Sequence, residues 1–214
     1  MSEKLYHFYH FHADGDWLEP ASDHFRALQE SGLLKALDGL YIGFIGNDTN
    51  ISRAMDWLNG YNTPYTVVTR VLTGFEQETL DQVQQFAKDN DGHVLYGHTK
   101  GAGYPVSISM PWRKSMIWYT IMKWQECIEH LDEGYTTVGS HWYPTGGPEH
   151  GGWPFWAGTY WWAKLQDLRL LDKPSRASRY DAEHWIGELQ QHMEIKQFDM
   201  NPNHISTDYL KYDW

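Results

Sequence analysis

The sequence predicts an α/β fold with a single, mostly parallel sheet flanked by helices. Two observations support this prediction. Short apolar segments alternate with amphipathic helical segments through the first 140 residues, and a repeated strand–helix order builds parallel sheets covered on both faces. The segment GLYIGFIG at 39–46 is also apolar throughout, which is typical of strands buried on both sides.

The first predicted strand covers residues 4–12, KLYHFYHFH. Side chains alternate between the two faces of a strand, which places Leu5, Tyr9 and Phe11 on one face and Tyr6 and Phe8 on the other. Both faces are largely apolar, so we expect this strand to be central.

A helix is predicted to follow over residues 20–28, with Ser22 as its candidate N-cap and Gly32 as its stop. The strand at 39–46 comes next. A short helix over 51–58 then ends at Asn59-Gly60.

The third predicted strand covers 65–72 and leads to a helix over 76–88, whose apolar residues recur at helical spacing. The fourth covers 94–96. Pro111 suits the first turn of a helix, and an apolar stripe continues from Trp112 to Leu131, which predicts one long helix.

A fifth strand is predicted at 135–139. Glycines and prolines then exclude regular structure over 140–154, a loop long enough to act as a lid. A late strand over 155–162 and a helix over 182–192, opened by Asp181, complete the predicted elements.

Length and composition limit the classes of function. The 214 residues indicate one domain over 1–214, with a core of about 4–192 and a tail over 193–214. The net charge of −11 argues against a nonspecific nucleic-acid binder, which needs a basic face. The single cysteine, Cys127, excludes a disulfide framework and is expected to be buried.

No long apolar segment opens the chain and no run of 18 apolar residues occurs. We therefore expect no signal peptide, no membrane span and a cytoplasmic protein, in the host cytoplasm if the source is viral. No GxGxxG follows the first strand and no GxxxxGK[ST] occurs, which argues against a dinucleotide fold and a P-loop enzyme.

The most informative segment is HVLYGHTKGAG at 93–103. A predicted strand runs directly into His98, Thr99, Lys100 and Gly101, and ligands of α/β proteins bind just beyond the carboxyl ends of strands. A hydroxyl, a cation and glycines suit a phosphate or a sugar hydroxyl. The alternative is a polar loop with an ordinary surface lysine.

Several segments together resemble a family of small glycosyltransferases found in bacterial polysaccharide loci and in viruses. The resemblance covers roughly residues 5–187 and is carried by an ordered set of motifs: YHFYHFH at 6–12, GLYIGFIGN at 39–47, FEQETL at 75–80, VLYGHTKGAG at 94–103, PWRKSM at 111–116, FWAGTYWWA at 155–163 and RYDAEHWIG at 179–187.

The resemblance implies a nucleotide-binding fold of the type A glycosyltransferase kind and transfer of a sugar from a nucleotide-sugar donor to an acceptor hydroxyl on a glycan, a protein or a modified nucleobase. The donor-binding residues it suggests are Gly46, Asn47, His98, Thr99, Lys100, Gly101 and Arg113. The acceptor-binding residues it suggests are Trp156, Trp161, Trp162, Arg179 and Trp185.

The sequence departs from this family pattern at the metal site. Type A glycosyltransferases usually carry Asp-x-Asp at the end of a central strand, where it holds a divalent metal such as Mn²⁺ or Mg²⁺. Here His98-Thr99-Lys100 stands at that point. Asp14-Gly15-Asp16 lies on the ligand side and Asp89-Asn90-Asp91 at the wrong end of the sheet, so we assign no metal ligand.

Without a metal, cations must stabilise the departing diphosphate, and Lys100 and Arg113 are the candidates. Arg113 is expected at the N-terminal end of the long helix, where an anionic partner would explain a cation. The alternative is a pair with a nearby acidic side chain.

Transfer to a hydroxyl also needs a base. Glu183 is the first candidate, Glu76 the second, with Asp181 behind them. Glu183 is also placed to favour a helix N-terminus electrostatically, so a capping role competes. Arg179 either fixes Glu183 or binds the acceptor.

Two other classes of function stay open. The aromatic cluster at 142–162 suits a carbohydrate-binding, lectin-like module, or else forms an aromatic core. His10 and His12, with a third histidine from His98, His141 or His150, would suit a zinc-dependent hydrolase.

Overall fold

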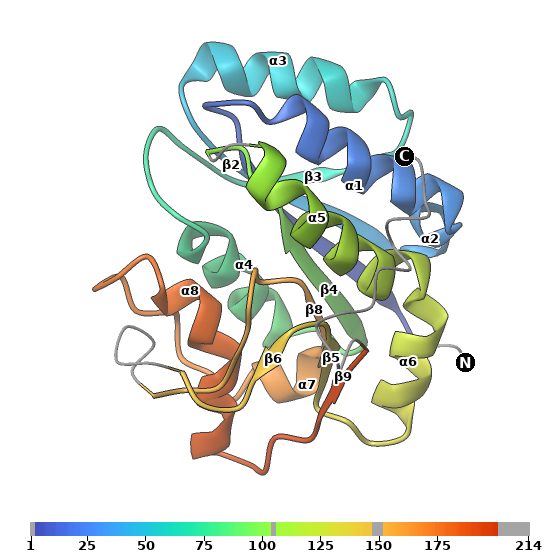
Figure 1. Ribbon diagram of the computed structural model, residues 1–214, viewed down its shortest axis with the longest axis vertical. Coiled ribbons are helices and arrows are strands. Elements are labelled where there is room, and N and C mark those ends of the chain that lie inside the picture. Colours follow the sequence, from blue (N-terminus) through green and yellow to red (C-terminus); the bar gives the residue numbers. More distant parts are fainter. Residues whose placement is uncertain (1–2, 104–105, 147–151, 201–214) are drawn as a thin grey trace.

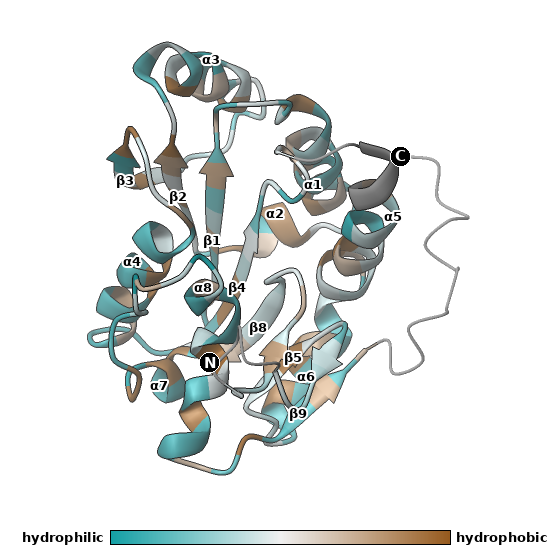
Figure 2. Cartoon of the chain, turned by 60° about the vertical axis from the view of Figure 1, so that its left-hand side comes forward, coloured by the Kyte–Doolittle hydropathy of each residue, from teal (hydrophilic) through white to brown (hydrophobic). Residues whose placement is uncertain are grey.

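A computed structural model describes residues 3–103, 106–146 and 152–200 of the chain. Its centre is a seven-stranded sheet in the order β3-β2-β1-β4-β8-β5-β9. Only β8 runs antiparallel to its neighbours, so the predicted, mostly parallel sheet is confirmed. Figure 2 shows the arrowheads of β1, β2 and β3 reaching the same edge.

The strands of this sheet are β1 (Leu5–His12), β2 (Gly39–Ile45), β3 (Thr66–Val71), β4 (His93–His98), β5 (Thr137–Gly139), β8 (Trp161–Lys164) and β9 (Gln197–Asp199). A separate two-stranded sheet pairs β6 (Trp142–Tyr143) with β7 (Phe155–Trp156). The helices are α1 (Leu18–Glu30), α2 (Leu33–Ala36), α3 (Asp48–Asn59), α4 (Gln77–Ala87), α5 (Val106–Ile117), the π-helix η1 (Trp118–Met122), α6 (Trp124–Asp132), α7 (Leu165–Leu168), α8 (Asp181–His184) and the 3₁₀-helix η3 (Trp185–Gln191).

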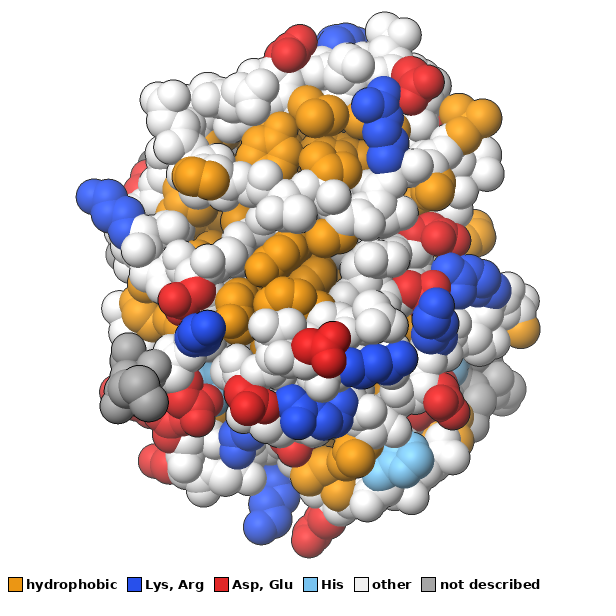
Figure 3. Space-filling model, turned by 180° about the vertical axis from the view of Figure 1, so that it is seen from behind, with side chains coloured by type: hydrophobic (Ala, Val, Ile, Leu, Met, Phe, Trp, Pro, Cys, Tyr) orange, Lys and Arg blue, Asp and Glu red, His pale blue; other side chains and the backbone are white. Residues whose placement is uncertain are grey.

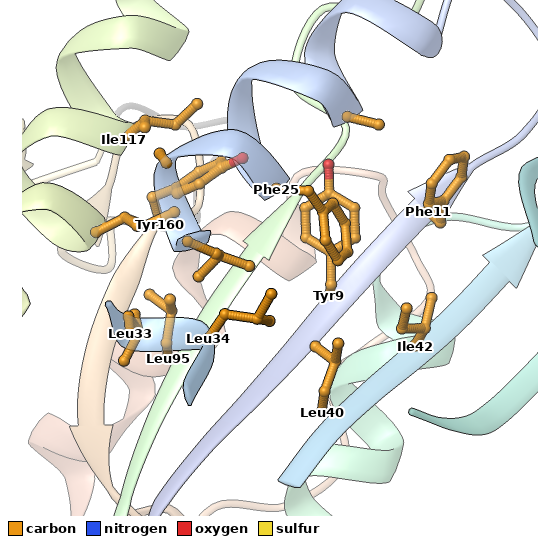
Figure 4. Packing of buried hydrophobic residues seen from close by; sticks show 14 of the residues in the cluster. Tyr9, Phe11, Phe25, Leu33, Leu34, Leu40, Ile42, Leu95, Ile117 and Tyr160 are labelled. Atoms are coloured by element: carbon orange, nitrogen blue, oxygen red, sulfur yellow. The ribbon is translucent and has the colours of Figure 1, made fainter. Parts of the chain in front are cut away.

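Helices cover both faces of the sheet (Figure 1). On one face, α1, α3, α5 and α6 bury a cluster that contains Tyr9, Phe11, Ile42 and Leu95 (Figure 4). Within it the rings of Tyr9 and Phe25 meet edge to face, 5.4 Å between centroids. On the other face, α4, α7 and α8 bury a second cluster.

The second cluster holds the even-numbered face of β1, with Tyr6 and Phe8, together with Trp156 of β7 and Trp161 of β8. Both faces of β1 are therefore buried, as the apolar alternation of residues 4–12 predicts, and β1 is a central strand. Cys127 is also buried, as expected.

Three expectations about helices and strands are wrong. Ser22 lies inside α1, whose N-cap is Trp17. The helix with Pro111 begins earlier, at Val106, and a π-helix at 118–122 separates it from α6. The predicted helix over 182–192 is a short α8 followed by the 3₁₀-helix η3.

The C-terminal part of the sheet also differs from the prediction. The late segment at 155–162 divides into β7, a turn and the start of β8. Residues 197–199, expected in a tail, form the edge strand β9 beside β5. The end of the expected tail, from Pro202, and the centre of the predicted lid loop, residues 147–151, lie outside the described residues.

No helix within the described ranges is long and apolar enough to cross a membrane. The surface seen from behind Figure 1 mixes Lys and Arg with Asp and Glu and shows no broad basic area (Figure 3).

Arg113 ties α5 to α1. Its side chain is 1% exposed, and its Nε and Nη2 donate to Oδ2 of Asp23 at 3.0 and 2.7 Å. Nη2 also lies 2.7 Å from Oε1 of Glu19. The expected place of Arg113 at a helix N-terminus is wrong, because α5 begins seven residues earlier, and the alternative of an acidic partner is confirmed.

Arg113→Met should destabilise the fold by about 3–5 kcal/mol, because it leaves the buried carboxylate of Asp23 without its cation. Urea unfolding measures the change. The matched control is Arg70→Ala, which breaks an exposed pair with Asp48 and should cost about 1 kcal/mol or less. Equal, small losses in both variants would contradict a structural role for the buried pair.

Candidate active site

A cavity of about 370 Å³ opens at the carboxyl ends of β1 and β4. It is lined by His10, His12, Gly74, Phe75, Glu76, His98, Thr99, Lys100, Gly101, Ala102, Gly103, Arg179, Tyr180 and Glu183. The cavity therefore unites the HTKG motif with Glu76 from the β3–α4 connection and with the start of α8. It is the edge of the sheet at which ligands bind in α/β proteins.

The HTKG loop is held to β1 by Thr99. The backbone N–H of Thr99 donates to the carbonyl of His10 at 3.0 Å, and the N–H of His12 donates to Oγ1 of Thr99 at 2.8 Å. Gly101 follows with φ of +96°, a conformation that favours glycine. Thr99 thus extends the pairing of the two strands beyond β4 and fixes where Lys100 leaves the sheet.

Lys100 is held from two sides. Its carbonyl lies 3.4 Å from Nη1 of Arg113, and its Nζ lies 4.7 Å from the centroid of the Trp112 ring, a cation–π contact. Of the two predicted cations, Lys100 lines the cavity. Arg113 does not belong to the described lining, and its guanidinium is buried against acidic side chains.

His98 and Glu76 form a pair at the cavity wall. Nδ1 of His98 lies 3.2 Å from Oε1 of Glu76, and Nε2 of His98 donates to the carbonyl of Gly158 at 2.9 Å. Since a carbonyl only accepts, Nε2 carries a proton. A neutral His98 then presents an unprotonated Nδ1, so the hydrogen between the two side chains comes from Glu76.

The pKa shifts agree with that assignment. Burial and, to a smaller extent, the nearby charge of Glu183 together raise the pKa of Glu76 from 4.5 to about 8. Burial lowers the pKa of His98 well below 6.5, with a further contribution from the charge of Lys100. At neutral pH the pair therefore holds a proton that Glu76 carries.

The turn between β7 and β8 helps to hold His98 of this pair in place. Gly158 and Thr159 have φ of +87° and +56°, and left-handed backbone is rare for a β-branched residue such as threonine. The turn aims the carbonyl of Gly158 at His98. The GTY part of the FWAGTYWWA motif thus has a positional role in the site.

The start of α8 forms the opposite wall, with Arg179, Tyr180 and Glu183. Nη2 of Arg179 donates to the hydroxyl of Tyr180 at 2.9 Å, and its guanidinium carbon lies 4.7 Å from that ring's centroid. Asp181 accepts from the N–H of Ser178 at 3.0 Å and is absent from the described lining. Glu183 thus faces the cavity and Asp181 serves the turn before the helix.

The tryptophans expected to bind an acceptor are core residues. Exposure is 0–1% for Trp156, Trp161, Trp162 and Trp185, so none presents a ring face to a sugar. Their N–H groups are also used internally: Trp162 donates to the carbonyl of Thr120 at 2.7 Å. These four tryptophans therefore give no support to a lectin-like module.

Gly46 and Asn47 do not line the cavity either, as far as the described residues show. Asn47 is the N-cap of α3 and donates through Nδ2 to Asp14 at 2.8 Å. Asn50 donates to the same carboxylate at 2.8 Å, and this bond, with a second from the backbone N–H of Asn47, lowers the pKa of Asp14. Asp14 is thus used to join the β1–α1 and β2–α3 connections.

Within the described residues, the histidines considered for a zinc site do not come together. His10 turns Nδ1 to Oγ1 of Thr79 at 2.8 Å, and His141 bonds Ser115 at 3.0 Å on another part of the molecule. His10, His12 and His98 are not a cluster with metal-binding geometry within the described part of the chain. His150 lies outside that part.

A neighbouring cavity of about 590 Å³ was not expected from the sequence. It lies beside the same edge of the sheet and is lined by Ala13, Gly15, Asp16, Trp17, Leu18, Asn50, Arg53 and Asp56. Arg53 lies in the second turn of α3, and Phe75 lies at the rim of the first cavity. Neither residue was assigned a chemical role from the sequence. Their placement follows from chain connections that a single sequence does not specify.

The stability of the fold should fall between pH 6.5 and 8 because of Glu76. Between pH 4.5 and 6.5 the unfolded chain keeps a proton on His98 where the folded protein keeps one on Glu76, so the two states bind equal numbers of protons at this pair. Above pH 6.5 only the folded state holds the proton, which costs stability at about 1.4 kcal/mol per pH unit. Unfolding of Glu76→Gln across this range should show no such fall. A fall of unchanged size in the variant would mean that another group causes it.

A solved structure of a 4-diphosphocytidyl-2C-methyl-D-erythritol synthase supports this fold. It is 9% identical to this chain, the match covers 92% of this chain and 90% of that one, and the TM-score is 0.50. The corresponding synthase of Anaerococcus prevotii DSM 20548 is 8% identical, with coverages of 92% and 87% and a TM-score of 0.48. A protein of Desulfovibrio desulfuricans G20, whose assignment as a nucleotide-diphospho-sugar transferase is itself an inference, is 14% identical, with coverages of 99% and 95% and a TM-score of 0.45.

At such low sequence identities, the similarity to these structures concerns the fold alone. No curated protein matches the sequence. A family model described as a domain of unknown function, DUF8361, matches residues 21–176. Since this match spans more than half of the chain, the protein belongs to the DUF8361 family.

Proposed function

We propose that this protein transfers a sugar from a nucleotide-sugar donor to an acceptor hydroxyl on a glycan, a protein or a modified nucleobase. One observation carries the proposal: a single cavity at the carboxyl edge of a parallel sheet brings together Lys100, Arg179 and the carboxylates Glu76 and Glu183. The fold shared with a diphosphocytidyl synthase supports a substrate that contains a nucleotide.

Lys100 is the group that would stabilise the leaving diphosphate. It follows β4 directly, and Gly101 and Gly103 beside it allow a phosphate to approach the backbone closely. A positioned cation of this kind acts where negative charge develops in the transition state. The cation–π contact with Trp112 limits where the ammonium group can lie.

The residues at the end of β4 do not fit a divalent metal. An imidazole that donates to Gly158, a hydroxyl that bonds His12 and an ammonium group replace the usual acidic ligands, and the charge of Lys100 opposes a second cation. Asp14, which belongs to the Asp14-Gly15-Asp16 segment, already accepts from Asn47 and Asn50. We therefore route no step through a metal.

Glu183 is the proposed base. Glu76 holds its proton at neutral pH and cannot accept another, which leaves Glu183 as the carboxylate of the cavity that can take the proton of the acceptor hydroxyl. The Glu76–His98 pair then positions the wall of the site. Opposite protonation of two neighbouring carboxylates is a common way to separate their roles.

Because the tryptophans are buried, we propose that residues at the rim of the cavity bind the acceptor. Tyr180 stacks with Arg179 at the cavity wall, and Phe75 is 59% exposed at its edge. Aromatic rings offer flat apolar faces to sugars and bases. Of the two roles considered for Arg179, we propose that it binds the acceptor and does not fix Glu183, because its guanidinium lies against Tyr180.

Incubation with a panel of nucleotide sugars, with and without Mn²⁺, tests the reaction class. Melting temperature reports donor binding, since tenfold-saturating ligand should add ~1.4 kcal/mol of stability. Release of a nucleoside diphosphate supports glycosyl transfer, whereas release of pyrophosphate from a nucleoside triphosphate would indicate nucleotidyl transfer instead. No response to UDP-, GDP-, CDP- or dTDP-linked sugars would contradict the proposal.

Lys100→Ala should slow transfer roughly 30- to 1000-fold and leave the fold intact, because one charge-assisted contact to the leaving group is lost, worth ~2–4 kcal/mol. Turnover at saturating donor is the measurement. Lys114→Ala is the control, since Lys114 lies on α5 but lines a different cavity. Unchanged turnover in Lys100→Ala would reduce HTKG to a structural turn.

Glu183→Gln should lower turnover ~100- to 10,000-fold while donor affinity is kept, because glutamine retains the shape but cannot take a proton. Glu188→Gln, farther along the same segment and in contact with His184, is the control. A less stable variant with normal specific activity would show that Glu183 only favours the helix start. Lost donor affinity would move Glu183 to the donor site.

A further inference from the structure

A second group of ligating side chains lies at the opposite end of the sheet from the candidate active site. Glu3 precedes β1, His93 is the first residue of β4 and Asp132 is the last residue of α6. Nε2 of His93 lies 3.0 Å from Oε2 of Glu3 and 3.5 Å from Oδ1 of Asp132. The three ligating atoms all lie within 4.8 Å of one another.

His93 points to a ligand independently of the two carboxylates. Its side chain is 1% exposed, and neither ring nitrogen makes a hydrogen bond in the described part of the chain. Buried polar groups are normally hydrogen-bonded. The backbone N–H of His93 donates to the carbonyl of Lys4 at 2.9 Å, and Nε2 of its ring faces Glu3 and Asp132.

The charges at this place favour a cation. The carboxylates of Glu3 and Asp132 face the one imidazole of His93, and carboxylate oxygen together with imidazole nitrogen is a ligand set that Zn²⁺ takes. Asp132 closes α6, where the helix dipole disfavours an acidic side chain.

We propose that Glu3, His93 and Asp132 bind a divalent transition-metal ion of the Zn²⁺ type. Zinc holds imidazole nitrogen and carboxylate oxygen at about 2.0–2.2 Å, so tetrahedral ligand atoms lie about 3.3 Å apart, and the two separations from His93 stand on either side of that value. The exposed carboxylates leave the remaining position to solvent.

Such an ion would join three segments that are distant in sequence. It would attach the segment before β1 and the end of α6 to the start of β4, while His98, at the other end of β4, belongs to the candidate active site. The proposed role is therefore structural, and it does not depend on the reaction proposed above.

The test is zinc titration of the full chain after removal of metals by a chelator. Calorimetry should show one Zn²⁺ per chain, with affinity at least tenfold weaker in His93→Gln, Glu3→Gln and Asp132→Asn. The matched control is Glu133→Gln, which removes the exposed partner of His130, another histidine–carboxylate pair at 3.0 Å, and should leave affinity unchanged. If His93→Gln fails to fold, the two exposed carboxylate variants still decide the matter.

Three results would overturn the proposal. The first is zinc affinity that is equal in all variants or absent in the unmodified chain. The second is binding of Ca²⁺ or Mg²⁺ as tight as that of Zn²⁺, because the imidazole would then add nothing. The third is an NMR titration in which His93 is protonated at neutral pH, since a proton would then do the work assigned to the metal.

Discussion

The candidate site depends on one buried ion pair, between Arg113 of α5 and Asp23 of α1. A buried guanidinium must keep its partner, because desolvation of either charge alone is costly. The same guanidinium approaches the carbonyl of Lys100, so the pair that holds two helices together also sets the start of the loop after β4. Arg113 does not line the cavity, but its removal would disturb Lys100, which does. Lost turnover in an Arg113 variant would therefore not identify a catalytic role for Arg113.

A chain of buried polar groups links the same elements through the core. His7 contacts the carbonyl of Leu95 at 3.0 Å and His24 at 2.8 Å, His24 lies 3.2 Å from the hydroxyl of Tyr160, and Tyr160 donates to the carbonyl of His98 at 2.6 Å. Burial lowers the pKa of His7 to about 4 and that of His24 well below 6.5, so both imidazoles are neutral at pH 7. His7, His24 and Tyr160 then have one proton each to donate, which gives three protons for four contacts. The carbonyl oxygens at the two ends only accept, so each of those contacts takes a proton. Of the two contacts between them, we assign the remaining proton to the shorter one, which leaves the longest contact, between His24 and Tyr160, without a proton.

The sequence was sufficient for the parallel sheet and for the end of it that carries the cavity, because period-two alternation and strand–helix order depend on near neighbours in the chain. It was insufficient to identify the partners of Arg113, because Glu19 and Asp23 are about ninety residues away in the chain. It also misassigned Trp156 and Trp161, since composition alone does not distinguish a stacking platform from a core. β9 is three residues long and pairs only with a distant strand, so it left no local pattern to recognise.

The two carboxylates of the cavity differ for a reason that the fold imposes. Glu76 lies between Tyr96, which donates to it at 3.3 Å, and His98, whose Nε2 is committed to Gly158. Since the strained turn at Gly158–Thr159 fixes that commitment, the ring nitrogen facing Glu76 has no proton of its own, and the carboxyl group must supply one. The negative charge of Glu183 favours the same state. A turn in the last third of the chain thereby determines which of two glutamates, from α8 or from the start of α4, is available as a base.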